Sequence, residues 1–131
     1  MDKKLRQHGA ISWFELMTSD VSAAKDFYEA IFCWQFNTFG DDPAGPYTMI
    51  KVGGEEVGGL MRTPAECSFK APAWGAYVTV DNIDATAAKI EELGGKILVP
   101  PTDIPNVGRF CVFADPQGAV LSAITYYPRP A

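Results

Sequence analysis

The sequence predicts an α+β fold in which two βαβββ modules share one core and enclose a cleft. The main observation is an internal repeat, since Trp13 to Asp20 and Trp74 to Asp81 both fit the pattern W-x4-T-x-D. The copies begin 61 residues apart, about half of the 131-residue chain, and each is followed by a helix-like stretch and strand-like segments. Two copies of this length indicate a duplicated module rather than a solenoid. We expect a single domain over residues 1–131, with modules at 9–62 and 74–126.

The first predicted module starts with a strand over 11–17, where apolar and polar side chains alternate with a period of two. Asp20 then caps a helix whose apolar positions follow helical spacing: Val21, Ala24, Phe27, Tyr28 and Ile31. Alternation and turn residues predict three further strands at 34–39, 47–52 and 57–61, after a turn-rich connection over 40–46. The last two strands form a hairpin.

The second predicted module repeats this order after a linker over 63–73. A strand over 75–80 leads to a helix that Asp81 caps and that Gly94-Gly95 ends. The inward positions of this helix are Ile83, Ala87, Ile90 and Leu93. Three strands follow at 96–99, 109–114 and 119–125, joined by a proline-rich loop over 100–108 and by the tight turn from Asp115 to Gly118.

Composition and charge indicate a self-sufficient globular domain and exclude several classes of partner. Hydrophobic residues make up 47% of the chain and charged residues 21%, which is typical of a globular domain. No apolar run approaches the roughly 18 residues of a membrane span, so we expect no membrane partner. The net charge of −5, without a basic cluster beyond the N-terminal tail, argues against nucleic acid. No signal peptide is visible, so a cytoplasmic location is expected. Cys33, Cys67 and Cys111 lack C-x-x-C spacing, which predicts buried free thiols.

Several motifs follow one another along the chain: Thr18-Ser-Asp20, Ala24-Lys-Asp-Phe27-Tyr28, Ile31-Phe-Cys-Trp34, Val80-Asp-Asn with Gly94-Gly95, and Phe113-Ala-Asp115-Pro-Gln-Gly118. Together they resemble the glyoxalase, bleomycin-resistance and extradiol-dioxygenase superfamily, also called vicinal oxygen chelate proteins. The resemblance spans about residues 9–126 and implies a cupped mixed sheet formed by the two modules. It is strongest to a sub-group of metal-poor, glyoxalase-like bacterial proteins.

The resemblance also bears on metal binding, because family members that catalyse reactions usually hold a divalent ion through inward-facing His or Glu side chains. The four matching positions here are occupied by Trp13, the run from Gly58 to Met61, Trp74 and Ser122. None of these offers a typical ligand, and the lone histidine, His8, lies in the charged N-terminal tail. We therefore expect no metal and no cofactor. A weak site that borrows Glu15 or Glu56 is the alternative.

Strand alternation predicts which side chains line the cup in place of metal ligands. On the strand over 11–17, Trp13 and Glu15 face inward, while Phe14 and Leu16 lie under the helix. On the strand over 75–80, the inward residues are Trp74, Ala76 and Val78, and the residues against the second helix are Gly75, Tyr77 and Thr79. The candidate ligand-binding set is Trp13, Glu15, Met49, Trp74 and Ser122.

The strand over 47–52 adds Tyr47, Met49 and Lys51 to this lining. The lining suits a flat apolar molecule that is held by stacking, with Glu15, Ser122 and Lys51 fixing its orientation. In the alternative, the aromatic side chains pack on one another and fill the cup. The small residues Gly58, Gly59 and Ala76 favour open space.

Two classes of function remain open. The first is a metal-independent module that binds a small apolar or aromatic molecule in the cup. The second is an enzyme, a lyase, isomerase or dioxygenase-type member of the same superfamily, with Glu15 as general base or with an atypical metal site. The resemblance also implies a homodimer, which would cover the apolar side chains Trp34, Phe69, Tyr126 and Tyr127.

Overall fold

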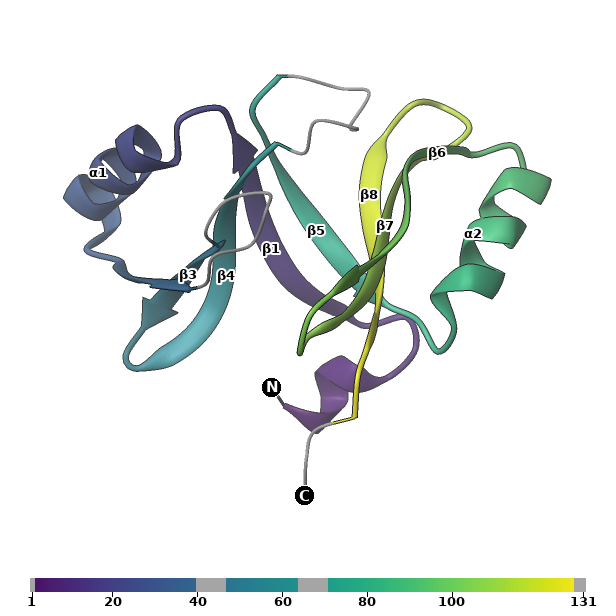
Figure 1. Cartoon of the computed structure of the whole chain (residues 1–131), viewed down its shortest axis with the longest axis horizontal. Helices are drawn as coiled ribbons and strands as arrows, with labels where there is room; N and C mark the ends of the chain where they lie inside the picture. The colour runs from purple at the N-terminus through teal and green to yellow at the C-terminus, as the bar shows by residue number, and fades with distance from the viewer. Residues whose placement is uncertain (1, 40–46, 64–70, 129–131) are drawn as a thin grey trace. The chain divides into compact units, whose positions relative to one another are not determined.

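The computed structural model describes residues 2–39, 47–63 and 71–128. The chain forms two compact units: the first unit is Trp13–Gly75, and the second unit is Met1–Ser12 together with Ala76–Ala131. Two α-helices and eight strands, counted over the described residues, follow the order of two βαβββ modules, which confirms the predicted fold class (Figure 1). The first module consists of β1 (Ile11–Thr18), α1 (Val21–Phe32), β2 (Gln35–Phe39), β3 (Tyr47–Val52) and β4 (Glu55–Arg62). The second consists of β5 (Ala73–Thr79), α2 (Ile83–Glu92), β6 (Lys96–Ile104), β7 (Gly108–Ala114) and β8 (Val120–Tyr126).

The strands of the first module follow the order β2-β3-β4-β1, with β1 and β4 parallel and the other neighbours antiparallel. Leu16 lies beside Leu60 in the parallel pair, and both are buried in one cluster with Ile50. Val21, Ala24 and Tyr28 of α1 pack on this cluster, as the helical spacing predicts. One face of these strands therefore carries α1, and the alternate residues of β1, including Glu15, point to the other face.

Helix α1 begins where the sequence predicts, because the Asp20 carboxylate accepts a hydrogen bond from the Ala23 N–H (3.0 Å). It ends at Cys33, whose N–H donates to the Glu29 carbonyl and whose φ of 57° is left-handed. The prediction that Phe27 and Ile31 face inward is wrong, since both are exposed. Phe27 comes one position before Tyr28, about 100° around the helix from the stripe that packs on the strands.

The second module has the strand order β5-β8-β7-β6, with β5 and β8 parallel. Its core joins Ile83 and Ala87 of α2 to Cys111 and Ala123 of the strands, with Ile90 packed against them. This confirms the predicted stripe of α2 except at Leu93, which lies beyond the last helical residue and is exposed.

Two predicted boundaries in this module are wrong. Asn82, not Asp81, caps α2, because its side-chain oxygen accepts from the Ala85 N–H (3.1 Å), three residues later, as an N-cap residue must. Strand β6 continues through Pro100 and Pro101 to Ile104, where a loop is predicted. Because β6 lies at the edge of the strand order of its module and shifts register there, a proline without an N–H is tolerated.

The N-terminal residues belong to the second unit rather than forming a free tail. A short 3-10 helix, η1 (Lys3–Arg6), is followed by Gly9, whose N–H donates to the Thr79 carbonyl (2.7 Å). The Thr79 N–H in turn donates to the Ala10 carbonyl (2.8 Å). No helix in the described part of the chain is long and apolar enough to cross a membrane.

The cysteines differ from one another in burial. Cys111 is buried, as predicted, and burial raises the pKa of its thiol to about 11. Cys33 is exposed at the end of α1, so the prediction of a buried thiol is wrong there. Cys67, Phe69 and the predicted turn over 40–46 lie outside the described residues.

Candidate functional site: an apolar hollow beside helix α1

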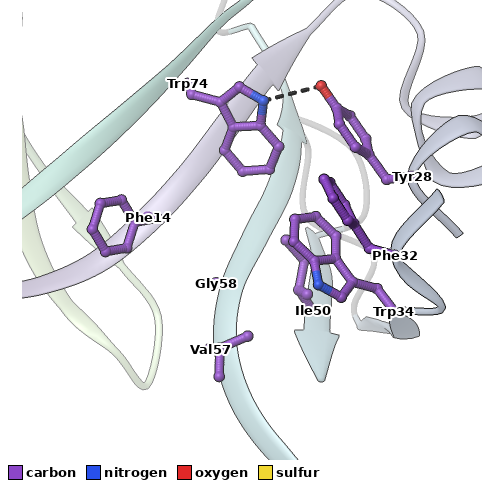
Figure 2. A pocket seen from close by; sticks show the side chains of 8 residues that line it. All are labelled: Phe14, Tyr28, Phe32, Trp34, Ile50, Val57, Gly58 and Trp74. Carbon is purple, nitrogen blue, oxygen red and sulfur yellow. Dashed lines mark hydrogen bonds between the residues drawn. The ribbon is translucent and has the colours of Figure 1, made fainter. Parts of the chain in front are cut away.

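The first unit contains an apolar hollow of about 550 Å³ (Figure 2). The residues that line it are Phe14, Tyr28, Phe32, Trp34, Ile50, Val57, Gly58 and Trp74. Ile50 and Gly58 are buried, whereas Trp74 is 42% exposed and Phe14 is 56% exposed. Buried residues thus lie next to aromatic rings that are open to solvent, an arrangement common in small-molecule sites.

Local structure brings these side chains to one place. Phe14 lies on the same face of β1 as Leu16, the face on which α1 packs. Tyr28 and Phe32 are four residues apart and so share one side of α1, and Trp34 follows two residues later. Trp74 comes from the start of β5 and, in Figure 2, its indole lies next to the Tyr28 side chain.

Four of the lining residues form a continuous group of ring contacts, here called the aromatic wall: Tyr28, Phe32, Trp34 and Trp74. Tyr28 lies at its centre, with ring centroids 5.4 Å from Trp74, 5.7 Å from Trp34 and 6.2 Å from Phe32. The Tyr28 and Phe32 planes differ by 10°, whereas Trp74 meets Tyr28 edge to face. Contacts of this kind contribute about 0.5–1.5 kcal/mol each, so the wall is held in place without a ligand.

One hydrogen bond joins two side chains of the aromatic wall. The indole Nε1–H of Trp74 donates to the hydroxyl oxygen of Tyr28 at 3.0 Å (Figure 2). This bond fixes the orientation of both rings and places a phenol hydroxyl at an otherwise apolar surface.

Gly58 allows β1 and β4 to lie close together on the buried side of the hollow. A methyl group at this position would lie 2.7 Å from the Phe14 carbonyl oxygen and 3.5 Å from Ile50 Cδ1. A larger residue there would therefore force β1 and β4 apart.

The adjacent glycine has a different role on the opposite face. A methyl group at Gly59 would overlap the ring and hydroxyl of Tyr47. Because Gly59 has no side chain, the Tyr47 ring fits over it and reaches Glu15, the residue that pairs with Gly59 in the strand register. The Tyr47 hydroxyl donates a hydrogen bond to Glu15 Oε2 at 2.7 Å. The same hydroxyl oxygen accepts from Trp13 Nε1–H at 2.9 Å. Glu15 is 4% exposed, so this network supplies hydrogen bonds to a buried carboxyl group.

The structure thus brings three predicted site residues, Trp13, Glu15 and Met49, to one face of the first module, since Met49 also pairs with Gly59 in the register. Tyr47 lies on this face as well, as its alternation with Met49 along β3 predicts. Lys51 lies on the same strand, and its Nζ lies 3.0 Å from the Asn37 amide oxygen when that amide is turned to accept.

Trp74 lies elsewhere in the first unit, and Ser122 belongs to the second unit. Within the second unit, Val78 pairs with Ala123, which belongs to the core under α2, while Tyr77 pairs with Ser122 on the alternate face. The predicted orientation of the strand over 75–80 is therefore wrong, because Val78 lies on the helix side and Tyr77 does not. Trp74 lines the hollow instead, and Ser122 is buried in the second unit.

The residues at the family's ligand positions do not fit a divalent ion. Trp13 and Trp74 use their indole N–H groups as hydrogen-bond donors, and indole offers no lone pair for a metal. Over residues 2–39, 47–63 and 71–128, no three His, Cys, Asp or Glu side chains gather into a possible site. His8 is exposed, and its Nδ1 accepts a hydrogen bond from the Asp81 N–H at 2.9 Å.

Arg109 is part of an exposed network in the second unit. Its guanidinium donates two hydrogen bonds of 3.1 Å to Asp84 and lies 3.3 Å from Asp103. Hydrogen bonding to Asp84 raises the Arg109 pKa, and the Tyr127 hydroxyl, which donates to Asp103 at 2.6 Å, lowers the pKa of that carboxyl. This network joins α2 to β6 and β7.

Comparison with solved structures agrees with the fold. A variant of methylmalonyl-CoA epimerase from Streptomyces coelicolor, in complex with 2-nitronate-propionyl-CoA, matches with a TM-score of 0.64 at 18% identity. The match covers 93% of this chain and 100% of that chain. Methylmalonyl-CoA epimerase from Mycobacterium tuberculosis matches with a TM-score of 0.60 at 15% identity, with 90% of each chain covered. Likeness at this level of identity concerns the architecture alone.

Sequence comparison gives closer relatives. The chain is 38% identical over 125 residues to CFP32, a candidate glyoxylase of Mycobacterium tuberculosis, with 95% of this chain and 47% of that protein covered. It is 32% identical over 126 residues to the anthracycline biosynthesis protein DnrV of Streptomyces peucetius, with 87% of this chain and 46% of that protein covered. The chain therefore spans about half the length of these relatives. The model of the Glyoxalase/Bleomycin resistance protein/Dioxygenase superfamily matches residues 10–122, and the chain belongs to this superfamily.

Proposed function

We propose that this chain is a glyoxalase-like protein that binds a small, flat, apolar molecule in the hollow beside α1. The observation that carries the proposal is the hollow itself, whose volume of about 550 Å³ lies within the usual range of small-molecule sites. Its walls are aromatic rings fixed by their contacts with one another, so little ordering is required when a ligand binds. The name of DnrV, an anthracycline biosynthesis protein, is compatible with a fused-ring ligand.

Two tryptophans on different faces provide the test. Trp74 lines the hollow, whereas Trp13 lies on the face that carries Glu15. Equilibrium dialysis with 9-fluorenone, a flat three-ring ketone, measures binding to the parent, to Trp74→Ala and to the matched control Trp13→Ala. Loss of a stacking ring costs about 1–3 kcal/mol, so Trp74→Ala should weaken binding by roughly 5- to 150-fold.

The outcomes separate clearly when circular dichroism shows that all three proteins are folded. Weaker binding in Trp74→Ala with parental affinity in Trp13→Ala supports the hollow. The reverse pattern moves the site to the face of Trp13, Glu15 and Met49, as the sequence predicts. Absence of binding to the parent rejects the proposal for this class of ligand.

A second candidate function is an enzyme in which Glu15 acts as a general base. It is favoured by the buried Glu15 carboxyl group and by its 2.7 Å hydrogen bond from Tyr47, because a group that must exchange a proton needs a fixed position. Glu15→Gln keeps the shape of the side chain and removes its basicity. A reaction that persists at the parental rate in this variant would reject the role.

We further propose that the protein carries no stoichiometric divalent metal. The proposal rests on Trp13, Trp74 and Ser122 at the family's ligand positions. Elemental analysis after dialysis should find far less than one equivalent of Zn, Ni, Fe or Mn, and one retained ion per chain would contradict it.

We propose that the protein forms a homodimer. Phe27 and Ile31 of α1 are large apolar side chains that are exposed in the single chain, with Phe27 at 60%. The relatives are about twice as long as this chain, which leaves room in each for a second unit of the same size. Light scattering at micromolar concentration should give twice the monomer mass of 14.2 kDa, and the monomer mass would reject the proposal.

A further inference from the structure

The hollow contains a hydrogen-bond donor that has no acceptor in the described part of the chain. The hydroxyl oxygen of Tyr28 accepts from Trp74 Nε1–H at 3.0 Å. A phenol hydroxyl also carries one proton to donate, and no group among the described residues receives the proton of Tyr28. The hydroxyl lies beside rings of the aromatic wall, so an acceptor on a bound molecule can reach it while the rings hold its apolar surface.

The hydrogen bond from Trp74 determines that Tyr28 donates, rather than accepts, a hydrogen bond to a ligand. An indole N–H can only donate, so the Tyr28 oxygen is the acceptor in that pair. A hydroxyl that accepts a hydrogen bond becomes a stronger donor, because the two bonds polarise each other. Tyr28 is therefore prepared to donate to a ligand atom, and the complementary atom is an acceptor such as a carbonyl or ether oxygen.

The geometry of the wall restricts how a ring system can lie. The Tyr28 and Phe32 rings are nearly parallel, with centroids 6.2 Å apart. A ligand ring inserted between these two rings would need two van der Waals spacings, about 7 Å between the two centroids. A ligand ring therefore does not fit between Tyr28 and Phe32. It must lie against the exposed rings of Phe14, Phe32 and Trp74, with its edge toward the Tyr28 hydroxyl.

We propose that the hollow selects planar aromatic molecules that carry an acceptor oxygen at the ring edge, such as aryl ketones, and that Tyr28 confers this selectivity. The inference rests on the proposed function, since it names the ligand class of the same hollow. Phe14, Phe32 and Trp74 provide apolar affinity for any flat ring system. The Tyr28 hydroxyl adds affinity only for those that accept a hydrogen bond.

Two probes of the same shape separate the contributions. 9-Fluorenone and fluorene differ in one carbonyl oxygen, and equilibrium dialysis gives the affinity of each for the parent and for Tyr28→Phe. The measured quantity is the ratio of ketone to hydrocarbon affinity, because the ratio cancels the apolar part within each protein. Loss of one neutral hydrogen bond should lower this ratio by about 3- to 10-fold in Tyr28→Phe.

Two further variants serve as controls. Tyr127→Phe removes a phenol hydroxyl that donates to Asp103 in the second unit, and it should keep the parental ratio. Trp74→Phe keeps an aromatic ring but removes the N–H that polarises Tyr28, so its ratio should fall between those of the parent and Tyr28→Phe.

The outcomes distinguish the role of Tyr28 from binding in the hollow. A lower ratio in Tyr28→Phe, with the parental ratio in Tyr127→Phe, supports the inference. An unchanged ratio, or an equal loss for both probes, overturns the role of Tyr28 while binding in the hollow stands. If neither probe binds the parent, the proposed function fails and the inference fails with it.

Discussion

Replacing Tyr47 by phenylalanine tests how the first unit accommodates a buried carboxyl group. The Tyr47 hydroxyl donates to Glu15 Oε2 at 2.7 Å and accepts from Trp13 Nε1–H at 2.9 Å, and Glu15 is 4% exposed. Phenylalanine keeps the ring over Gly59 and removes both hydrogen bonds. The change therefore measures the network with little loss of packing.

The size of the effect follows from the two bonds. A hydrogen bond to a charged group contributes about 1.5–3 kcal/mol and a neutral one about 0.5–1.5 kcal/mol. Their sum is an upper limit, because the contributions of two hydrogen bonds that share one hydroxyl are not additive. We expect Tyr47→Phe to lower the free energy of unfolding by about 2–3 kcal/mol, which at a urea slope of about 2 kcal/mol/M moves the midpoint down by about 1–1.5 M.

Urea unfolding followed by circular dichroism at pH 7 measures this shift. Tyr127→Phe is the matched control, because its hydroxyl also donates to a carboxylate but does so at an exposed position. The control should lower the midpoint much less than Tyr47→Phe does, because its hydrogen bond is exposed to solvent. If the two variants lower the midpoint equally, or if Tyr47→Phe unfolds at the parental midpoint with an unchanged slope, the Tyr47 hydroxyl does not compensate the burial of Glu15.

Three further predictions concern other parts of the chain. Cys33→Gly should stabilise the protein by about 1 kcal/mol in urea unfolding, because the φ of 57° at the end of α1 is strained for cysteine and free for glycine; an unchanged midpoint would contradict this. In a Cys67→Ser background, Ellman's reagent at pH 8 should modify the exposed Cys33 at once. Cys111, buried and with a pKa of about 11, should react only on unfolding, and immediate reaction of two thiols would refute its burial. The hydrogen bond from Tyr127 lowers the pKa of Asp103 below its ordinary value of 3.8, so the ionised carboxylate stabilises the fold above that pH and loses this effect as pH falls through the lower folded-state pKa. The urea midpoint of the parent should therefore exceed that of Asp103→Asn at pH 7, and the difference should shrink below about pH 4; a constant difference would rule out this origin.

The candidate site was predicted in part. Alternation along β1 correctly separated Leu16, which packs under α1, from Glu15, which points to the other face. It did not reveal that Phe14, on the same face as Leu16, is 56% exposed and lines a hollow. Alternation assigns a face to a side chain, but the length of α1 and the position of Trp34 after it determine how much of that face is covered.

The sequence by itself determined the duplicated βαβββ order, the start of α1 at Asp20 and the helical stripe that packs on the first module, because these depend on local spacing and capping. Tertiary structure decided which residues of β5 lie on the side of α2 and which lie on the other face of the strand. The repeat equates Trp74 with Trp13, yet Trp74 bonds to Tyr28 and Trp13 to Tyr47. A strand has two faces that differ by one residue, and the partner strand and helix select between them through burial. Only the folded chain supplies those partners, so only the tertiary structure could show that a tryptophan predicted in the cup belongs to a hollow beside α1.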